Sequence, residues 1–234
     1  MEKKLTGIVV SVKPYGADFM ITLITAEEGL VNVLVENKPS FFKYAKEFLT
    51  FGYFTVKVKG GFFCILLKCE IIDTFLKIKN SNLKFLEAKN LCGVVKEVAQ
   101  LNDKDTPLFM EFCESLKALN YKDLPPNLVL TKLLSTIFVG FSKSISFQTC
   151  DVCGQSLKNF YFLNFANCTF VCQNCQEKLS KPISKQTFGT LKRFIETHYD
   201  DIENLINFDN KKILQLLIEI FRFKVGERFK FYSE

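Results

Sequence analysis

Four cysteines in two pairs are the residues of this sequence whose spacing most clearly predicts chemistry. Cys150 and Cys153 form one Cys-x-x-Cys pair and Cys172 and Cys175 form the second. The pairs stand at the ~15–20-residue separation of four-thiolate zinc sites. Gly154 follows the first pair and permits the positive φ angle of a turn that brings two thiolates to one ion. Because four sulfur ligands leave no open coordination position, the pattern predicts a structural Zn²⁺ site.

A fifth cysteine leaves the ligand set open at this stage. Cys168 precedes Cys172 closely and could replace one of the four ligands. We favour Cys172 and Cys175 because they repeat the spacing of the first pair. The alternative is a group of free thiols or a redox pair. Redox sites usually carry a single Cys-x-x-Cys beside a βαβ pattern, so the repeated pairs favour zinc.

The composition is that of a globular protein with ample material for a core. The 234 residues include 48% hydrophobic and 24% charged residues, enough for one large domain or about two to three small ones. Nine cysteines and an N-terminus without an apolar h-region predict a reducing, cytoplasmic compartment. The longest apolar run, residues 62–67, is far shorter than the ~20 residues of a membrane span, so we expect no membrane association.

The charge balance permits nucleic acid as a partner without requiring it. The formal net charge is +6 and the pI is about 8.7. The sequence has 26 phenylalanines and no tryptophan. We therefore do not interpret every phenylalanine as a platform for stacking bases.

Five short strands are predicted in the first eighty residues. The apolar or alternating segments are 5–12, 19–25, 30–35, 53–59 and 62–73, with a longer excursion between the third and fourth. Lys13-Pro14-Tyr15-Gly16 predicts the first turn, and Gly29 can adopt a left-handed position in the second. This order predicts a small Greek-key barrel of the OB type. Such barrels commonly bind single-stranded nucleic acid, but a barrel used only for protein contacts fits the pattern equally well.

Helices are predicted in most of the remaining chain. Apolar residues recur at helical spacing after residues 80–82, and Thr106 is the expected N-cap of the next helix, with Pro107 in its first turn. Asp209 is expected to cap a final helix over 211–225. The predicted class is α+β with several domains. Its segments are an OB-fold domain at 1–80, the first part of a helical domain at 81–149, a four-cysteine zinc segment at 150–176, and the second part of the helical domain at 177–234.

Several of these segments resemble the RecO family of recombination mediators. Residues 5–12 (LTGIVVSV), 15–16 (YG) and 21–31 (ITLITAEEGLV) resemble the opening of its OB barrel. The helix that leads into Cys-x-x-Cys-Gly at 150–154, and the FYFL segment at 160–163 before the second cysteine pair, resemble its zinc hairpin. The chain departs from the family at residues 36–46, where a basic, glycine-containing loop is usual.

The resemblance implies a DNA-binding recombination mediator rather than an enzyme. It implies binding to single- and double-stranded DNA and annealing of complementary strands. It also implies work with RecR and with single-stranded-DNA-binding protein (SSB) to load recombinase in gap and break repair. We expect such a protein in the bacterial cytoplasm, associated with the nucleoid. Some family members lack the four cysteines, so the metal is expected to stabilise the fold.

Two basic clusters are the candidate DNA contacts. Cationic side chains bind phosphates, and arginine does so in a bidentate manner that lysine cannot. In the tail the basic residues alternate with aromatic residues that could stack on bases; the alternative there is a solvated face with a hydrophobic anchor. The candidates are Lys38, Lys43, Lys46, Lys57 and Lys59 in the barrel, and Arg222, Lys224, Arg228 and Lys230 in the tail.

Two other functional classes stay open at this stage. The lysine-poor segment 36–46 is compatible with a zinc-stabilised scaffold that joins proteins and has little contact with DNA. A DNA-processing enzyme is the other alternative. The sequence has no phosphate-binding glycine loop, and its single histidine, His198, lies beside Asp200 and Asp201 without a nucleophile motif. These features argue against catalysis.

Overall fold

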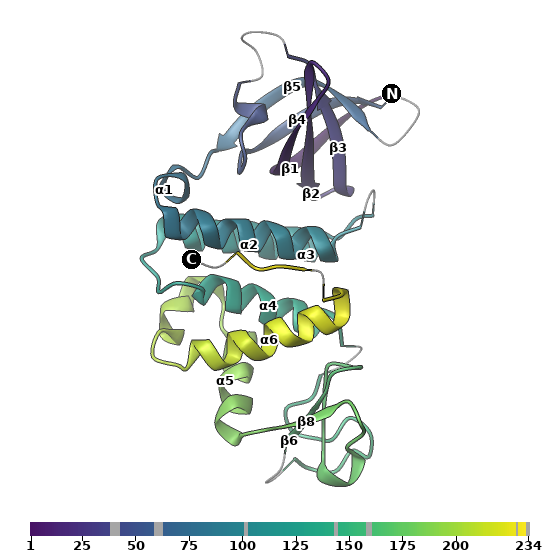
Figure 1. Ribbon diagram of the computed structural model, residues 1–234, viewed down its shortest axis with the longest axis vertical. Coiled ribbons are helices and arrows are strands. Elements are labelled where there is room, and N and C mark those ends of the chain that lie inside the picture. The colour runs from purple at the N-terminus through teal and green to yellow at the C-terminus, as the bar shows by residue number, and fades with distance from the viewer. Residues whose placement is uncertain are drawn as a thin grey trace. The chain divides into compact units, whose positions relative to one another are not determined.

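A computed structural model describes residues 1–37, 43–58, 63–100, 103–142, 145–157, 161–227 and 229–232. Contacts group the chain into two units, Met1–Asn120 and Tyr121–Glu234. The fold is α+β, with the strands of the first unit followed by helices (Figure 1). The first unit extends beyond the boundary predicted at residues 80–82 because the helices that follow the strands contact them directly.

Five strands close into a barrel in the first unit (Figure 1). All five predicted strands are present, and the last is one continuous strand. The ladder runs in the order β1-β2-β3-β5-β4, and its pairs are antiparallel except for the short parallel pairing of β3 with β5. The strands are β1 (Glu2–Tyr15), β2 (Asp18–Thr25), β3 (Gly29–Val35), β4 (Phe51–Val58) and β5 (Cys64–Asp73). Residues 59 and 62, which the sequence placed in the last two strands, lie outside the described residues.

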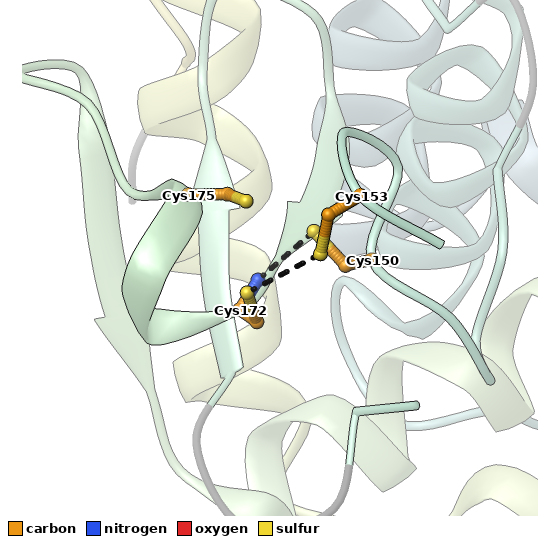
Figure 2. A group of neighbouring side chains, drawn as sticks. All are labelled: Cys150, Cys153, Cys172 and Cys175. Atoms are coloured by element: carbon orange, nitrogen blue, oxygen red, sulfur yellow. Dashed lines mark hydrogen bonds between the residues drawn. The ribbon is translucent and has the colours of Figure 1, made fainter. Parts of the chain in front are cut away.

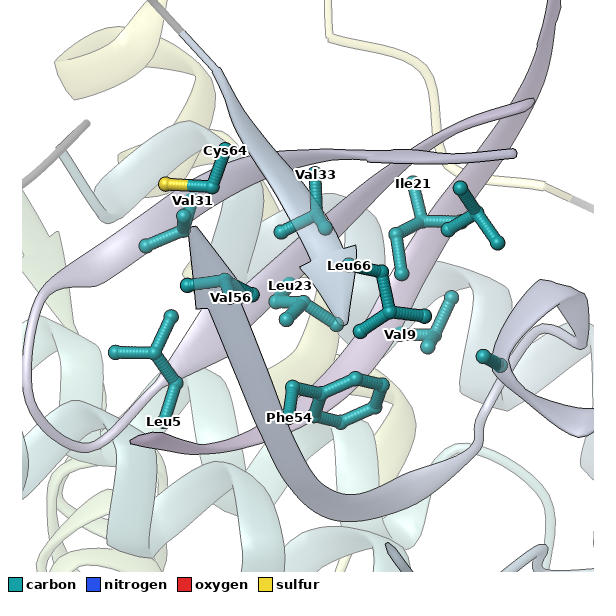
Figure 3. Close-up of a cluster of buried hydrophobic side chains, with 12 residues drawn as sticks. Leu5, Val9, Ile21, Leu23, Val31, Val33, Phe54, Val56, Cys64 and Leu66 are labelled. Atoms are coloured by element: carbon teal, nitrogen blue, oxygen red, sulfur yellow. The ribbon is translucent and has the colours of Figure 1, made fainter. Parts of the chain in front are cut away.

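Alternating side chains of these strands fill the barrel interior. On β4, Phe54 and Val56 are fully buried while Tyr53 and Lys57 face outwards, as the two-residue period of a strand requires. Figure 3 shows the interior cluster, in which Leu5, Leu23 and Phe54 meet residues of the other strands. The alternation that predicted the strands therefore also identifies the core.

The first turn lies later than predicted. β1 continues through Pro14 and pairs Tyr15 with Asp18 of β2, so the turn is made by the two residues between them. The prediction at Lys13-Pro14-Tyr15-Gly16 was wrong because a proline is compatible with a strand edge that needs no N–H donor. The second turn is as predicted, with Gly29 at φ +61°.

Short helices and two long ones complete the first unit. The long helices contact the barrel through defined groups: the amide of Leu30 donates to the carbonyl of Gln100 (3.1 Å), and the ring of Phe48 meets that of Phe85 edge-on (5.7 Å). The helices are η1 (Tyr44–Lys46), α1 (Leu76–Lys79), α2 (Asn82–Val98) and α3 (Thr106–Tyr121).

The N-cap of α3 is Asp105 rather than the predicted Thr106. The Asp105 carboxylate accepts a hydrogen bond from the amide of Leu108 (3.0 Å), which satisfies a free N–H group of the first turn. Thr106 is already the first residue of α3, and its hydroxyl donates to the carbonyl of Ala26 (3.1 Å). A tertiary contact with the barrel has thus displaced the expected cap by one residue.

The second unit combines helices with a three-stranded sheet in the order β7-β6-β8. Asp209 caps the last helix as predicted, because its carboxylate accepts from the amide of Lys212 (3.3 Å). The elements are α4 (Leu128–Gly140), β6 (Tyr161–Asn164), β7 (Thr169–Val171), η2 (Gln173–Cys175), β8 (Ser180–Ile183), α5 (Lys185–Glu196), η3 (Tyr199–Leu205) and α6 (Asn210–Val225).

Aromatic rings join the small sheet to the helices. Phe188 of α5 lies at the centre, with the rings of Tyr161, Phe170 and Phe147 at centroid distances of 4.1, 4.8 and 5.5 Å. Phe170 also contacts Phe138 of α4 at 6.3 Å. The sheet that carries the second cysteine pair is therefore anchored by hydrophobic packing.

Candidate metal centre and nucleic-acid interface

The structure brings Cys150, Cys153, Cys172 and Cys175 together. All four sulfur atoms lie within 4.8 Å of one another, and Figure 2 shows the side chains directed into one space between two loops. The Sγ atoms of Cys153 and Cys172 are 3.8 Å apart. Two thiolates bound at ~2.3 Å to a tetrahedral zinc ion are separated by about 3.8 Å. The four side chains could therefore bind a metal ion, and the arrangement is consistent with zinc.

Local backbone geometry explains how each pair turns back on itself. Gly154 adopts φ +70°, and its amide donates to the carbonyl of Cys150 (2.9 Å). In the second pair the amide of Cys175 donates to the carbonyl of Cys172 (3.1 Å) within the short helix η2. The left-handed position predicted for Gly154 is thus present.

The charge state of the thiols favours a cation at this position. Burial opposes ionisation of Cys150, but hydrogen bonds from the amides of Cys153, Cys172 and Val152 lower the pKa of Cys150 to about 6. Interaction with the Cys153 thiol, together with burial, raises the pKa of Cys175 to about 12. A thiolate is stabilised at Cys150 and opposed at Cys175, as expected for like charges at close range. A divalent ion would supply the missing charge and release protons on binding.

Cys168 does not belong to this cluster. Its side chain is buried in the turn between β6 and β7, and its thiol donates to the carbonyl of Phe165 (3.8 Å). Burial raises the pKa of the Cys168 thiol to about 11, which disfavours the thiolate that a metal requires. The cluster thus consists of the two Cys-x-x-Cys pairs and leaves out the fifth cysteine.

The candidate lysines of the barrel differ in how free their ammonium groups are to bind a phosphate. Lys43 is exposed, with its Nζ 6.0 Å from the ring centroid of Tyr44. Lys46 is half-buried: its Nζ donates to Asn37 (2.9 Å) and lies 4.8 Å from the ring centroid of Phe19. Lys46 therefore stabilises the segment that follows β3 and is a poor candidate for a free cation.

Lys57 is the exposed candidate on the barrel wall. It lies on β4 opposite Glu2 of β1, so a carboxylate stands next to it across the strands. Lys38 and Lys59 lie outside the described residues, as does Arg228 in the tail.

The candidate tail residues do not form one surface. Arg222 and Lys224 are two positions apart on α6, so they point to nearly opposite sides of the helix. Arg222 is exposed, with its guanidinium 5.7 Å from the ring centroid of Phe231. Lys224 donates to the carbonyl of Ala166 in the small sheet. Lys230 is exposed beyond the helix end.

Two of the tail aromatics serve packing. The rings of Phe229 and Phe231 contact Phe221 of α6 at 5.2 and 6.1 Å, and each other at 4.8 Å. This matches the alternative of a hydrophobic anchor. Phe223, by contrast, has 47% of its surface exposed.

A groove beside the four-cysteine segment at residues 150–176, called the metal segment below, contains two lysines that were not among the predicted DNA contacts. It has a volume of about 850 Å³ and runs between α6 and the chain that follows the second cysteine pair. Lys178 and Lys181 line it from one side and Arg222 from the other. No motif marks these lysines, because their meeting with α6 depends on how the small sheet packs.

Within the described residues, no helix is both long enough and apolar enough to cross a bilayer.

Comparison with known proteins decides the family. Residues 84–232 match the family described as "Recombination protein O C terminal". The chain belongs to the RecO family. A protein named "DNA repair protein RecO" from Acetivibrio thermocellus is 26% identical over 214 residues, covering 88% of this chain and 83% of that protein. Relatives of the same name from Thermoanaerobacter sp. (strain X514) and Clostridium novyi (strain NT) are 25% and 23% identical, covering 80% and 92% of this chain and 77% and 87% of their own lengths.

The RecO match covers most of α2, the other long helices, the cysteine cluster and the tail. It therefore includes every element that forms the metal centre and the groove. The identities extend the relationship into the barrel, because each alignment spans at least four fifths of the chain.

Proposed function

We propose that this RecO-family chain is a DNA repair protein that acts as a recombination mediator, binding single- and double-stranded DNA and annealing complementary strands. The observation that carries the proposal is the family match over 84–232, in a chain whose relatives are named DNA repair proteins. Annealing requires basic surfaces that neutralise two phosphate backbones and needs no nucleotide hydrolysis, so we propose no catalytic activity. RecR and SSB are the proposed partners in loading recombinase.

The barrel supports this role through its topology. The order β1-β2-β3-β5-β4, with parallel β3 and β5, fits the five-stranded OB type, whose grooves commonly hold single strands. The exposed Lys43 and Lys57 are its described basic candidates. The ion at the four cysteines is proposed to be Zn²⁺ with a structural role, because four thiolates complete its coordination.

A protein-joining scaffold is the second candidate. It is favoured by Lys46 and Lys224, two predicted DNA contacts that are instead held by Asn37 and by the carbonyl of Ala166. Under this alternative the chain would bind its partners and leave DNA to them.

Strand annealing with and without SSB tests the choice. Two complementary labelled oligonucleotides are mixed with the protein, and the paired product is followed in time. We expect faster annealing on naked strands and, if the mediator role is right, on SSB-coated strands. Binding should weaken steeply with salt, with a log–log slope of about 0.7 per phosphate contact for single strands. A parent protein that neither binds nor anneals DNA, but captures RecR or SSB, would establish the scaffold instead.

The same strands test the absence of catalysis. Incubation with Mg²⁺ or Mn²⁺ should return both oligonucleotides at full length. Metal-dependent shortening that persists in a second, independently purified batch would contradict a purely binding role.

A further inference from the structure

The groove between α6 and the metal segment is built from two separate parts of the second unit. One face of α6 contributes Gln215, Ile218, Glu219, Arg222 and Phe223, which recur at the three- and four-residue spacing of a single helix face. Lys178 and Leu179, which directly precede β8, form the opposite side. The volume of about 850 Å³ is in the range of sites that hold a ligand of several chemical groups.

Two cations of the groove are not neutralised by an ion pair. Lys181 forms an ion pair with Glu219, so these two charges cancel locally. Among the ion pairs of the described residues, none involves Lys178 or Arg222. Glu227 is the remaining carboxylate of the lining. The groove therefore presents positive charge from both sides to an incoming anion.

An aromatic side chain lines the same groove as these cations. Phe223 is 47% exposed, and its ring meets Phe165 edge-on with centroids 6.2 Å apart. The contact fixes the ring while much of its surface stays open. Arg222 is also held, because its guanidinium packs over Phe231. An open ring beside cations is the combination that single-strand binding uses, since every unpaired base has a face that stacks.

We infer that this groove holds a short run of single-stranded nucleic acid, with a phosphate between Lys178 and Arg222 and a base on Phe223. The inference rests on the proposed DNA binding and adds a location for it in the second unit. It adds Lys178 to the predicted DNA contacts and takes Lys224 out of them, because Lys224 faces the opposite side of α6. A paired base could not reach Phe223, so duplex DNA should bind here more weakly.

A single tryptophan provides a direct probe of the base contact. The chain contains no tryptophan, so Phe223→Trp introduces one reporter at the groove. Titration with an oligothymidylate of about ten nucleotides should quench its fluorescence, because a stacked base quenches an indole. The matched control is Tyr121→Trp, an exposed aromatic outside the groove lining, which should change little. Equal responses at the two positions, or none at Phe223→Trp while the oligonucleotide is bound, overturn the inference.

A charge variant tests the phosphate contact. Lys178→Ala combined with Arg222→Ala should lower the log–log salt slope by about 0.7, because the two cations share one phosphate. Lys185→Ala with Lys211→Ala removes the same charge from exposed helix positions outside the groove and should leave the slope nearly unchanged. Phe223→Ala should weaken binding about 5- to 150-fold. Thermal unfolding of each variant confirms that these exposed positions do not alter the fold.

Two further outcomes separate this inference from the proposed function. A groove variant that binds and anneals DNA like the parent overturns the inference and leaves DNA binding to the barrel. A parent that binds no DNA overturns both. An acidic peptide with apolar side chains is the competing kind of ligand. If such a peptide quenches Phe223→Trp and the oligonucleotide does not, the groove is a protein-docking site and the inference is wrong.

Discussion

The ring of Tyr161 lies stacked on the ring of Phe188, with the centroids 4.1 Å apart and the planes inclined by 26°. Tyr161 belongs to β6 of the metal segment and Phe188 to α5, so this contact joins two elements that the thiols do not connect. The small sheet is therefore held to the helices by packing, and the four thiols would join it to its own loops when they bind a metal.

Removing the central ring should destabilise the second unit strongly. Phe188→Ala deletes a buried side chain that contacts three other rings, and such changes cost about 3–5 kcal/mol. Urea unfolding followed by circular dichroism measures the loss. Phe223→Ala, at a half-exposed position with one ring contact, is the control and should cost clearly less, at most about 1.5 kcal/mol. Similar costs for both variants would contradict the assigned packing role.

The purified protein should contain about one zinc ion per chain, bound by four thiolates. Cys172→Ser should lose the metal in elemental analysis, because its sulfur belongs to the cluster. Cys168→Ser should keep it, because that thiol lies outside the cluster. A metal-free Cys168→Ser protein that is otherwise folded would reverse the ligand assignment.

Thiol reactivity should divide the nine cysteines into two groups once the metal is chelated. Burial raises the pKa of Cys113 to about 12, which leaves roughly one thiolate in 10⁴ at pH 8. Cys153 of the cluster is exposed and should therefore be alkylated before the buried Cys113. Peptide mass mapping after timed alkylation checks the order. Labelling of Cys113 before Cys153 would show that the barrel unit opens more readily than the metal loops.

Alkaline pH should reduce the stability of the first unit. The Cys92 thiol is fully buried in α2, and burial raises its pKa above the value of an unfolded thiol. The unfolded state therefore loses this proton first as the pH rises, so the contribution is complete below about pH 8.5 and declines above it. Urea midpoints at pH 8 and pH 10 should differ less in Cys92→Ala than in the parent. An equal difference would assign the alkaline loss to other groups.

Gly29 should tolerate no side chain. It adopts φ +61°, and a Cβ atom there would lie 2.1 Å from the carbonyl oxygen of Asp103. Gly29→Ala should therefore cost clearly more than the ~1 kcal/mol of a left-handed alanine alone. Gly16→Ala, at φ +63° with open space around it, isolates that conformational part. Matching urea midpoints for the two variants would argue against close packing of the turn.

The sequence predicted the strands well because alternation and turn residues are local signals. Phe54 and Val56 could be assigned to the core from the pattern alone. The turn after β1 and the cap of α3 were misplaced because both depend on partners elsewhere: Pro14 continues a ladder with β2, and Thr106 is held by the carbonyl of Ala26. Local sequence preferences predict the approximate position of a turn or a helix cap, and tertiary contacts can shift that position by a residue.

The metal centre was predictable because its geometry is encoded in the spacing of two short loops. The basic surface was not predictable in this way. Arg222 and Lys224 are neighbours in sequence, yet they serve different sides of α6, whereas Arg222 and Lys178 share a groove. Charged residues that are close in sequence form one surface only if the packing of the helix and the sheet brings them together. Local spacing and motifs do not predict that packing.

The contact of the Gly29 turn with Gln100 and Asp103 also orders events during synthesis of the chain. The amide of Leu30 finds its acceptor in Gln100, and Gly29 packs against Asp103. Chains emerge from the ribosome N-terminus first and domains fold as units. The barrel strands can pair early, but this turn stays uncapped until the stretch after α2 has left the tunnel. A translational pause before that point would hold on the ribosome a barrel whose second turn lacks these contacts, whereas a pause after α3 would let the first unit fold completely before any cysteine of the metal centre has been made.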